Sequence, residues 1–236
     1  MFFPMIQLHY HNMKQKYLIA NWKSNKTTFE VESFFRQLQK KFASRQLTKA
    51  VIPVICPVFV HLHLAKLLIN QLKLPIFLGA QDTSPFGLGA YTGEVSSSQL
   101  KEYISFCIIG HSERRKYFQE SDDLLKNKVE LAVKWGMEVI FCVPDSLTPI
   151  PSQVKIVAYE PVFAIGTGKP DTPENALKVI KEIKMKHNIP YVLYGGSITA
   201  DNISQYLTQE EINGVLVGGA SLDPDHYFRM MINASA

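Results

Sequence analysis

The segment KYLIANWKSNKTTFEVESFFRQLQKKF, residues 16–42, holds a predicted strand and a predicted helix in succession. The strand is the run Tyr17–Ala20, whose apolar residues do not alternate with polar ones, as is typical of a strand buried on both faces. The helix follows from apolar residues spaced so that they share one face of an α-helix. A strand followed by a helix is the repeating unit of a parallel α/β fold. The apolar residues of the helix are Val31, Phe34, Phe35, Leu38 and Phe42.

The same unit recurs along the rest of the chain. Helical spacing reappears within residues 125–133 and 176–187, and the cap residues Ser121, Thr172 and Asp223 precede helical stretches. Eight strands alternating with helices in 236 residues predict a closed barrel with its site at the carboxyl ends of the strands. An open doubly wound sheet is the alternative, but no G-x-G-x-x-G motif follows the first strand. The other predicted strands are Val51–Cys56, Ile76–Ala80, Ile104–Ile109, Met137–Val143, Val154–Tyr159, Tyr191–Tyr194 and Val215–Val217.

One unit lacks its helix. Only the sequence VPDSLTPIPSQ separates Cys142 from Val154, and its three prolines are incompatible with a full helix. The sequence therefore predicts an extended or single-turn link between the fifth and sixth strands.

Composition limits the class of protein. A net charge of +4, with 19% charged and 46% hydrophobic residues, describes an ordinary globular surface and disfavours nucleic-acid binding. The cysteines Cys56, Cys107 and Cys142 are not spaced as pairs, which favours reduced, buried thiols in the cytosol. No apolar run reaches the roughly 18 residues of a membrane span. Residues 1–13 contain no Lys or Arg and are expected to be a poorly ordered extension without a targeting signal, and residues 14–236 a single domain.

Polar residues and glycines follow five of the predicted strands. Each alone has an ordinary explanation as a surface charge, a helix cap or a turn residue. Since the carboxyl ends of barrel strands meet at one rim, the residues together predict a pocket holding a cation, an imidazole, a carboxylate and two glycine turns. They are Asn21 and Lys23, His111 and Glu113, Glu160, the GGS turn at 195–197, and the GGAS turn at 218–221.

Six motifs surround these residues: ANWKSN (20–25), GAYTGEVS (89–96), IIGHSERR (108–115), AYEPVFAIGTGK (158–169), YGGS (194–197) and GVLVGGASL (214–222). They resemble, in the same order, the motifs of the triosephosphate isomerase family. The resemblance extends from Lys14 onward and implies a (β/α)8 TIM barrel, here with the helix after strand five absent or reduced to a short link.

The resemblance implies a reaction and the roles of the catalytic residues. Dihydroxyacetone phosphate and D-glyceraldehyde 3-phosphate interconvert through an enediolate, with Glu160 as the base that removes a proton from carbon. His111 is the neutral donor to the substrate oxygens, since the helix start that follows it disfavours a charged ring. Lys23 and Asn21 stabilise the developing oxyanion, and Glu113 organises the site.

The same resemblance implies which residues bind the substrate phosphate and how the subunits assemble. Backbone N–H groups of Gly166, Ser197, Gly218 and Gly219 are expected to hold the phosphate, with no metal and no cofactor. The loop around Thr92 is expected to reach the site of a partner subunit in a cytoplasmic homodimer. Neither nucleic acid nor a membrane is an expected partner.

Two departures from the family pattern lie near the predicted lid, the segment that follows Glu160. Phe163 stands where the family usually has Trp, and Pro144-Asp145 stand where it usually has Gly-Glu. The side chain of Phe has no N–H donor. We therefore hypothesise that a contact between the lid and the segment after strand five is lost on both sides together, while the catalytic chemistry is kept. The alternatives are a non-catalytic barrel that binds sugar phosphates and another phosphate-binding barrel enzyme, such as an indole-glycerol-phosphate synthase type.

Overall fold

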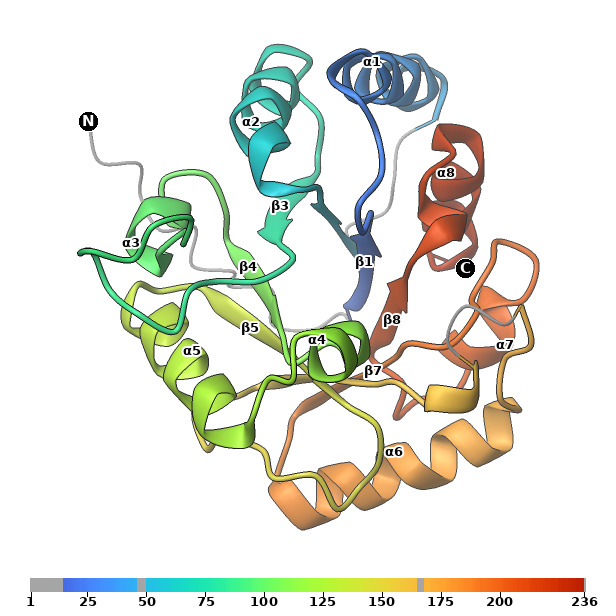
Figure 1. Cartoon of the computed structure of the whole chain (residues 1–236). Helices are drawn as coiled ribbons and strands as arrows, with labels where there is room; N and C mark the ends of the chain where they lie inside the picture. Colours follow the sequence, from blue (N-terminus) through green and yellow to red (C-terminus); the bar gives the residue numbers. More distant parts are fainter. Residues whose placement is uncertain (1–14, 46–49, 165–167, 236) are drawn as a thin grey trace.

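The strands close into a parallel barrel in a computed structural model that describes residues 15–45, 50–164 and 168–235 (Figure 1). Each strand pairs with the next in the chain, and β1 closes the ring by pairing with β8. The closed barrel confirms the predicted architecture and excludes the open sheet. The predicted extension, residues 1–13, lies outside the described residues. The strands are β1 (Lys16–Asn21), β2 (Val51–Cys56), β3 (Phe77–Ala80), β4 (Phe106–Ile109), β5 (Glu138–Val143), β6 (Ile156–Tyr159), β7 (Tyr191–Tyr194) and β8 (Gly214–Val217).

Helices surround the barrel, and α4 lies over the centre of the ring of strands (Figure 1). The predicted caps are confirmed: the side chains of Ser121, Thr172 and Asp223 each accept a hydrogen bond from a backbone N–H in the first turn of their helix. The α-helices are α1 (Thr28–Ser44), α2 (Leu62–Gln71), α3 (Ser97–Leu100), α4 (Ser112–Tyr117), α5 (Asp122–Lys134), α6 (Pro173–His187), α7 (Ile203–Leu207) and α8 (Pro224–Asn233). The 3-10 helices are η1 (Phe59–His61), η2 (Val162–Ala164) and η3 (Gly219–Ser221).

Apolar side chains fill the barrel on both sides of its wall. Those pointing inward, such as Ile19, Ile108 and Leu216, form one buried cluster, and those pointing outward pack against the helices in a second cluster. The interior is therefore a packed core, and a ligand site has to lie at a rim.

No helix separates β5 from β6 in the described part of the chain, as the sequence predicts. The link runs between α5 and α6 (Figure 1) and is tied to α6 at Ser146. The Ser146 hydroxyl donates to Glu182 Oε2 at 3.0 Å, and the Ser146 carbonyl lies 3.2 Å from His187 Nε2. Strand bounds match the predicted runs or differ from them by one or two residues at an end. The two-residue differences arise because Ile104 and Val154 are buried before their strands begin.

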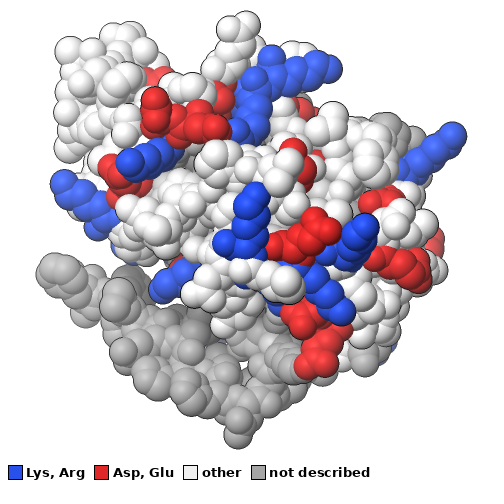
Figure 2. Space-filling view, turned by 90° about the horizontal axis from the view of Figure 1, so that it is seen from below, with Lys and Arg blue, Asp and Glu red and all other residues white. Residues whose placement is uncertain are grey.

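The surface carries both signs of charge. On the face shown in Figure 2, basic and acidic side chains are interspersed, without a continuous field of one sign. None of the described helices is long and apolar enough to cross a membrane.

Candidate active site

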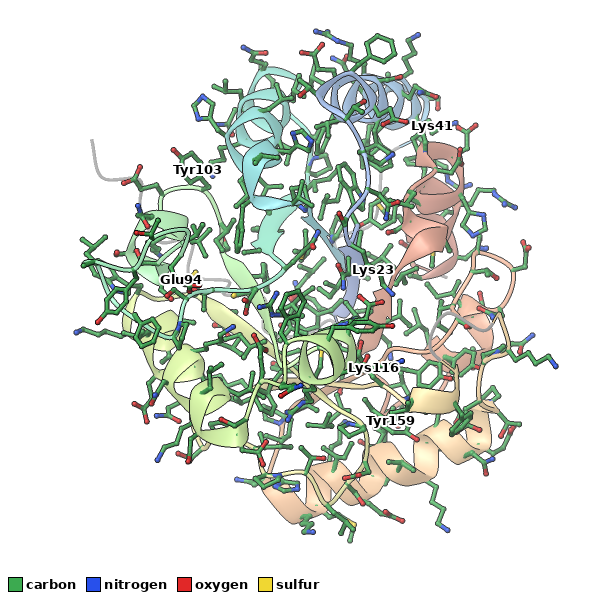
Figure 3. The ribbon with its side chains drawn as sticks, in the orientation of Figure 1. Lys23, Lys41, Glu94, Tyr103, Lys116 and Tyr159 are labelled. Carbon is green, nitrogen blue, oxygen red and sulfur yellow. The ribbon has the colours of Figure 1, made fainter. Side chains whose placement is uncertain are left out.

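A pocket opens where the carboxyl ends of β1, β4, β6, β7 and β8 meet, with a volume of about 310 Å³. Seven of the nine predicted site residues line this pocket, together with neighbours that the sequence did not single out. Figure 3 shows one of them, Lys23, at the end of β1 near the centre of the barrel. Gly166 lies outside the described residues. The lining residues are Asn21, Lys23, His111, Glu160, Gly168, Gly195, Ser197, Ile198, Thr199, Leu216, Gly218, Gly219 and Ala220.

Lys23 adopts a left-handed backbone conformation, with φ of 53°. A non-glycine residue costs roughly 1–2 kcal/mol in that region, so the neighbours must hold it there. The Lys23 N–H donates to Asn21 Oδ1 at 3.0 Å, and Gln81 Nε2 donates to the Lys23 carbonyl at 2.9 Å and to the Cys56 carbonyl at 2.9 Å. Gln81 follows β3 directly, so the rule that identified the other rim residues also points to it, although the sequence analysis did not include it.

His111 and Glu160 are buried and in direct contact. His111 Nε2 lies 3.0 Å from Glu160 Oε1, and the two residues are 5% and 3% exposed. The other oxygen of Glu160 accepts a hydrogen bond from the Ser112 backbone N–H at 3.0 Å. Both carboxylate oxygens are therefore in contact with the start of α4, one with its N-cap His111 and the other with its first residue, Ser112.

The start of α4 also fixes the other side of the imidazole ring. His111 is the N-cap of α4, and its Nδ1 accepts the Glu113 N–H at 3.2 Å, so Nδ1 carries no proton in this arrangement. The proton of a neutral ring then lies on Nε2, facing Glu160.

The pKa of His111 differs from the sequence expectation. Burial lowers the pKa of His111, but the carboxylates of Glu160 and Glu113 raise it more, and the net pKa lies above the ordinary histidine value. The helix start that was expected to disfavour a charged ring is present, but the expectation left out the carboxylate of Glu160. That carboxylate decides the direction of the His111 pKa shift.

Glu113 contacts the site without lining the pocket. Its Oε1 accepts Lys23 Nζ at 2.5 Å, and its Oε2 lies 3.7 Å from His111 Nδ1. The acid therefore connects the cation that follows β1 with the imidazole that follows β4.

The glycine turns lie beside Glu160 and Lys23, and an added Cβ on Gly195 would lie 3.0 Å from Glu160 Cγ. An added Cβ on Gly218 would lie 3.2 Å from Lys23 Cε, so the absence of a side chain allows the turn to approach that lysine. The Ser197 hydroxyl donates to the Ala164 carbonyl at 2.6 Å, which ties the turn after β7 to the segment after Glu160.

The two departures from the family pattern are both at the surface. Phe163 is 65% exposed, and Asp145 Oδ1 accepts hydrogen bonds from Leu147 N, Thr148 N and Thr148 Oγ1 at 2.8–2.9 Å. Burial raises the pKa of Asp145, but these hydrogen bonds lower it more, so the net pKa is below its ordinary value. Asp145 thus stabilises its own turn.

The three cysteines are not among the residues that line this pocket, but the Cys142 thiol interacts with Glu160, which does line it. Cys142 is buried, and burial raises the pKa of its thiol well above the ordinary value, as expected for a reduced, buried thiol. Among the described residues, no group of three or more His, Cys, Asp or Glu side chains could hold a metal ion.

Comparison with known proteins covers nearly the whole chain. A family model described as triosephosphate isomerase matches residues 16–235. A triosephosphate isomerase of Mycoplasmoides gallisepticum is 40% identical over 260 aligned residues, covering 94% of this chain and 99% of the relative. Triosephosphate isomerases of Dictyoglomus turgidum and Mesomycoplasma hyopneumoniae are each 38% identical, covering 92% and 93% of this chain and 98% and 100% of the relatives.

Proposed function

We propose that the reaction of this chain takes place in the pocket lined by Lys23, His111 and Glu160. The chain belongs to the triosephosphate isomerase family and interconverts dihydroxyacetone phosphate and D-glyceraldehyde 3-phosphate. The observation that carries the proposal is the buried contact of 3.0 Å between His111 and Glu160, both of which line that pocket. Such a pair, an imidazole donor beside a carboxylate shielded from water, suits proton transfer between adjacent carbons.

Glu160 is the base in this proposal. Its two oxygens are held by Ser112 N–H and His111 Nε2, so the carboxylate has to exchange these contacts for the substrate carbon. Only rotation about the side chain is required, because Glu160 directly follows β6 and its backbone N–H is bound to the Val143 carbonyl at 2.8 Å.

His111 moves protons between the two substrate oxygens. The carboxylate that raises its pKa leaves the ring when Glu160 turns to the substrate. Its Nδ1 keeps the Glu113 N–H, so the ring is then held neutral with its Nε2 proton directed into the pocket.

Lys23 and Asn21 stabilise the oxyanion of the enediolate. Fixed charge and fixed donors lower the energy of a developing negative charge, and the left-handed backbone of Lys23 is held by Asn21 and Gln81 before substrate arrives. Glu113 keeps the ammonium group in place at 2.5 Å.

The phosphate group binds at the glycine turns of the pocket. Backbone N–H groups of Gly166, Ser197, Gly218 and Gly219 are the proposed donors, the last two at the start of η3. Ser197, Gly218 and Gly219 line the same pocket as Lys23, which supports a substrate lying across it.

A coupled assay of the purified protein tests the proposal. Glu160→Gln, which keeps size but removes the base, is expected to lower kcat by about 10²–10⁴-fold or more. Glu130→Gln, a change of the same type at an exposed position on α5, is the control and is expected to match the wild type. Unchanged activity in Glu160→Gln would exclude Glu160 as the base, and triose phosphate binding without turnover by the wild type would favour the non-catalytic barrel.

The proposed assembly is a cytoplasmic homodimer. The loop between β3 and α3 exposes Thr92 together with apolar side chains: Phe86 and Tyr91 stack at 4.3 Å yet are 45% and 44% exposed, and Leu88 is 71% exposed. Exposed apolar side chains on one loop support contact with a second subunit. The solution mass of the wild type tests this, and a monomer at micromolar concentration would contradict it.

A further inference from the structure

Asp171 anchors the end of the segment that follows the pocket. This segment runs from Gly168, which lines the pocket, to Thr172, the N-cap of α6. The Asp171 N–H donates to the Tyr194 hydroxyl at 2.8 Å, its carbonyl accepts the Tyr206 hydroxyl, and its Oδ1 accepts the Thr172 N–H at 2.8 Å. Both sides of one residue's backbone are therefore bound by tyrosines from β7 and α7.

The two tyrosines form one buried unit. Their rings stack with centroids 4.6 Å apart and planes 7° apart, and Tyr194 and Tyr206 are 0% and 1% exposed. A stack of this geometry restricts the rotation of both rings, so the two hydroxyls hold fixed positions. We call Tyr194 and Tyr206 the tyrosine pair.

The tyrosine pair also contacts the turn after β7. An added Cβ on Gly196 would lie 2.5 Å from the Tyr194 hydroxyl, so the turn passes directly against the phenol. The next residue, Ser197, lines the pocket and binds the Ala164 carbonyl at 2.6 Å. The pair therefore packs against one wall of the pocket and, through Asp171, anchors a second.

We propose that Tyr206 is a positioning residue for the phosphate end of the pocket, acting through Tyr194 and Asp171. Tyr206 does not line the pocket, and its effect comes from holding Asp171 and the Tyr194 ring so that Gly168 and Ser197 stay at the spacing that a phosphate requires. This inference rests on the proposed function, because the phosphate is that of the triose substrate.

A purely structural role is the competing explanation, since any buried tyrosine contributes to stability. Tyr227 offers a matched control. It is fully buried, and its hydroxyl donates to the carbonyls of Leu18 and Val54 at 3.2 and 3.3 Å, among the strands and away from the pocket lining. Tyr206→Phe and Tyr227→Phe both remove a buried phenol hydroxyl that donates to backbone carbonyl oxygen, and both keep the ring.

The test compares KM for dihydroxyacetone phosphate, kcat, and the inhibition constant of inorganic phosphate in both variants. Tyr206→Phe is expected to raise KM and the inhibition constant together by about three- to ten-fold, the effect of one buried hydrogen bond, with kcat changed less than about two-fold. Tyr227→Phe is expected to lower Tm while leaving KM and the inhibition constant within about two-fold.

Unchanged KM and phosphate inhibition in Tyr206→Phe would overturn the proposal, and so would equal shifts in both variants. Protection of the protein against thermal unfolding by inorganic phosphate gives a readout that needs no turnover. If the wild type lacked isomerase activity, the proposed function would fail, while weaker phosphate protection in Tyr206→Phe than in Tyr227→Phe would still support the positioning role.

Discussion

Lys128 is a buried cation whose removal should destabilise the protein severely. It is 2% exposed on α5, and its ammonium lies 2.7 and 2.8 Å from the two carboxylate oxygens of Asp82 and 2.5 Å from Glu120 Oε1. Arg114 contacts the same two carboxylates at 2.9 and 2.8 Å. Lys128→Met keeps the length of the side chain but leaves two buried carboxylates with one cation.

The expected loss follows from burial. Removing one partner of a buried, hydrogen-bonded ion pair costs about 3–5 kcal/mol, because the charge left behind has no compensation. Lys184→Met is the matched control: Lys184 also lies 2.7 Å from a carboxylate, Glu211 Oε2, but the pair is partly exposed. A pair of that kind contributes about 0–1 kcal/mol.

Urea unfolding at fixed protein concentration measures the free energy of unfolding of both variants. Repeating it at several pH values tests whether the loss in Lys128→Met comes from the buried carboxylates. Burial raises the pKa of Asp82 more than Lys128 and Arg114 lower it, so the unfolded chain releases this proton first, and stability falls as pH rises from about 3.8 through the raised value. Loss of Lys128 raises the pKa of Asp82 further. The deficit of Lys128→Met should therefore be largest near neutral pH and shrink on acidification. A deficit no larger than that of Lys184→Met, or one that grows on acidification, would refute this reasoning.

Three further changes test other parts of the structure. Because the pKa of His111 is raised by Glu160 in the folded chain, the charged ring stabilises the fold below the ordinary value of 6.5 and this contribution is lost as pH rises through the raised pKa. Urea unfolding of His111→Asn should therefore show a larger deficit at about pH 5.5 than at about pH 9, and the reverse order would contradict the cause. Phe163→Trp, at a side chain 65% exposed, should leave kcat within about two-fold in the coupled assay, whereas several-fold slower turnover would show that the indole had found a partner. Gly214→Ala places a Cβ 2.2 Å from the Tyr17 carbonyl oxygen, so thermal unfolding should report a loss of about 3 kcal/mol or more, and wild-type stability would contradict the close approach of β1 and β8.

Local patterns were sufficient to predict the barrel. Unbroken apolar runs, helical spacing and three cap residues each reflect interactions within a few neighbouring residues, and the structure confirms them as strands, helices and N-caps. The rim rule then predicted which residues share a pocket, because parallel strands place their carboxyl ends together. Long-range contacts were beyond this reasoning. The contact of His111 with Glu160 depends on how the barrel closes, and the direction of the His111 pKa was missed for that reason.

Buried charge was equally hidden in the sequence. Lys128 follows Leu125 by three residues and precedes Val129, so it falls on the apolar side of α5, where all three are buried. A lysine at such a position can extend its ammonium group to solvent or be fully buried. Which of the two occurs depends on whether neighbouring segments place carboxylates beside it. Asp82 and Glu120 supply these carboxylates from other segments, so the sequence pattern of α5 alone does not predict either contact.

The missing helix after β5 is compatible with an intact site because of where the site residues originate. Among the described residues that line the pocket, none belongs to β5 or to the link that follows it. The strand itself keeps its place: β5 pairs with β4 and β6 on either side, and Phe141, on its outer face, is buried and covered by the Arg115 guanidinium 5.6 Å from its ring centroid. Arg115 also donates to the Gly110 carbonyl at 2.9 Å, directly before His111. The cover over β5 therefore comes from α5, which packs against this strand, and from Arg115 of α4, the helix that contacts Glu160. Since neither depends on the missing helix, shortening this unit leaves the pocket end of the barrel supported.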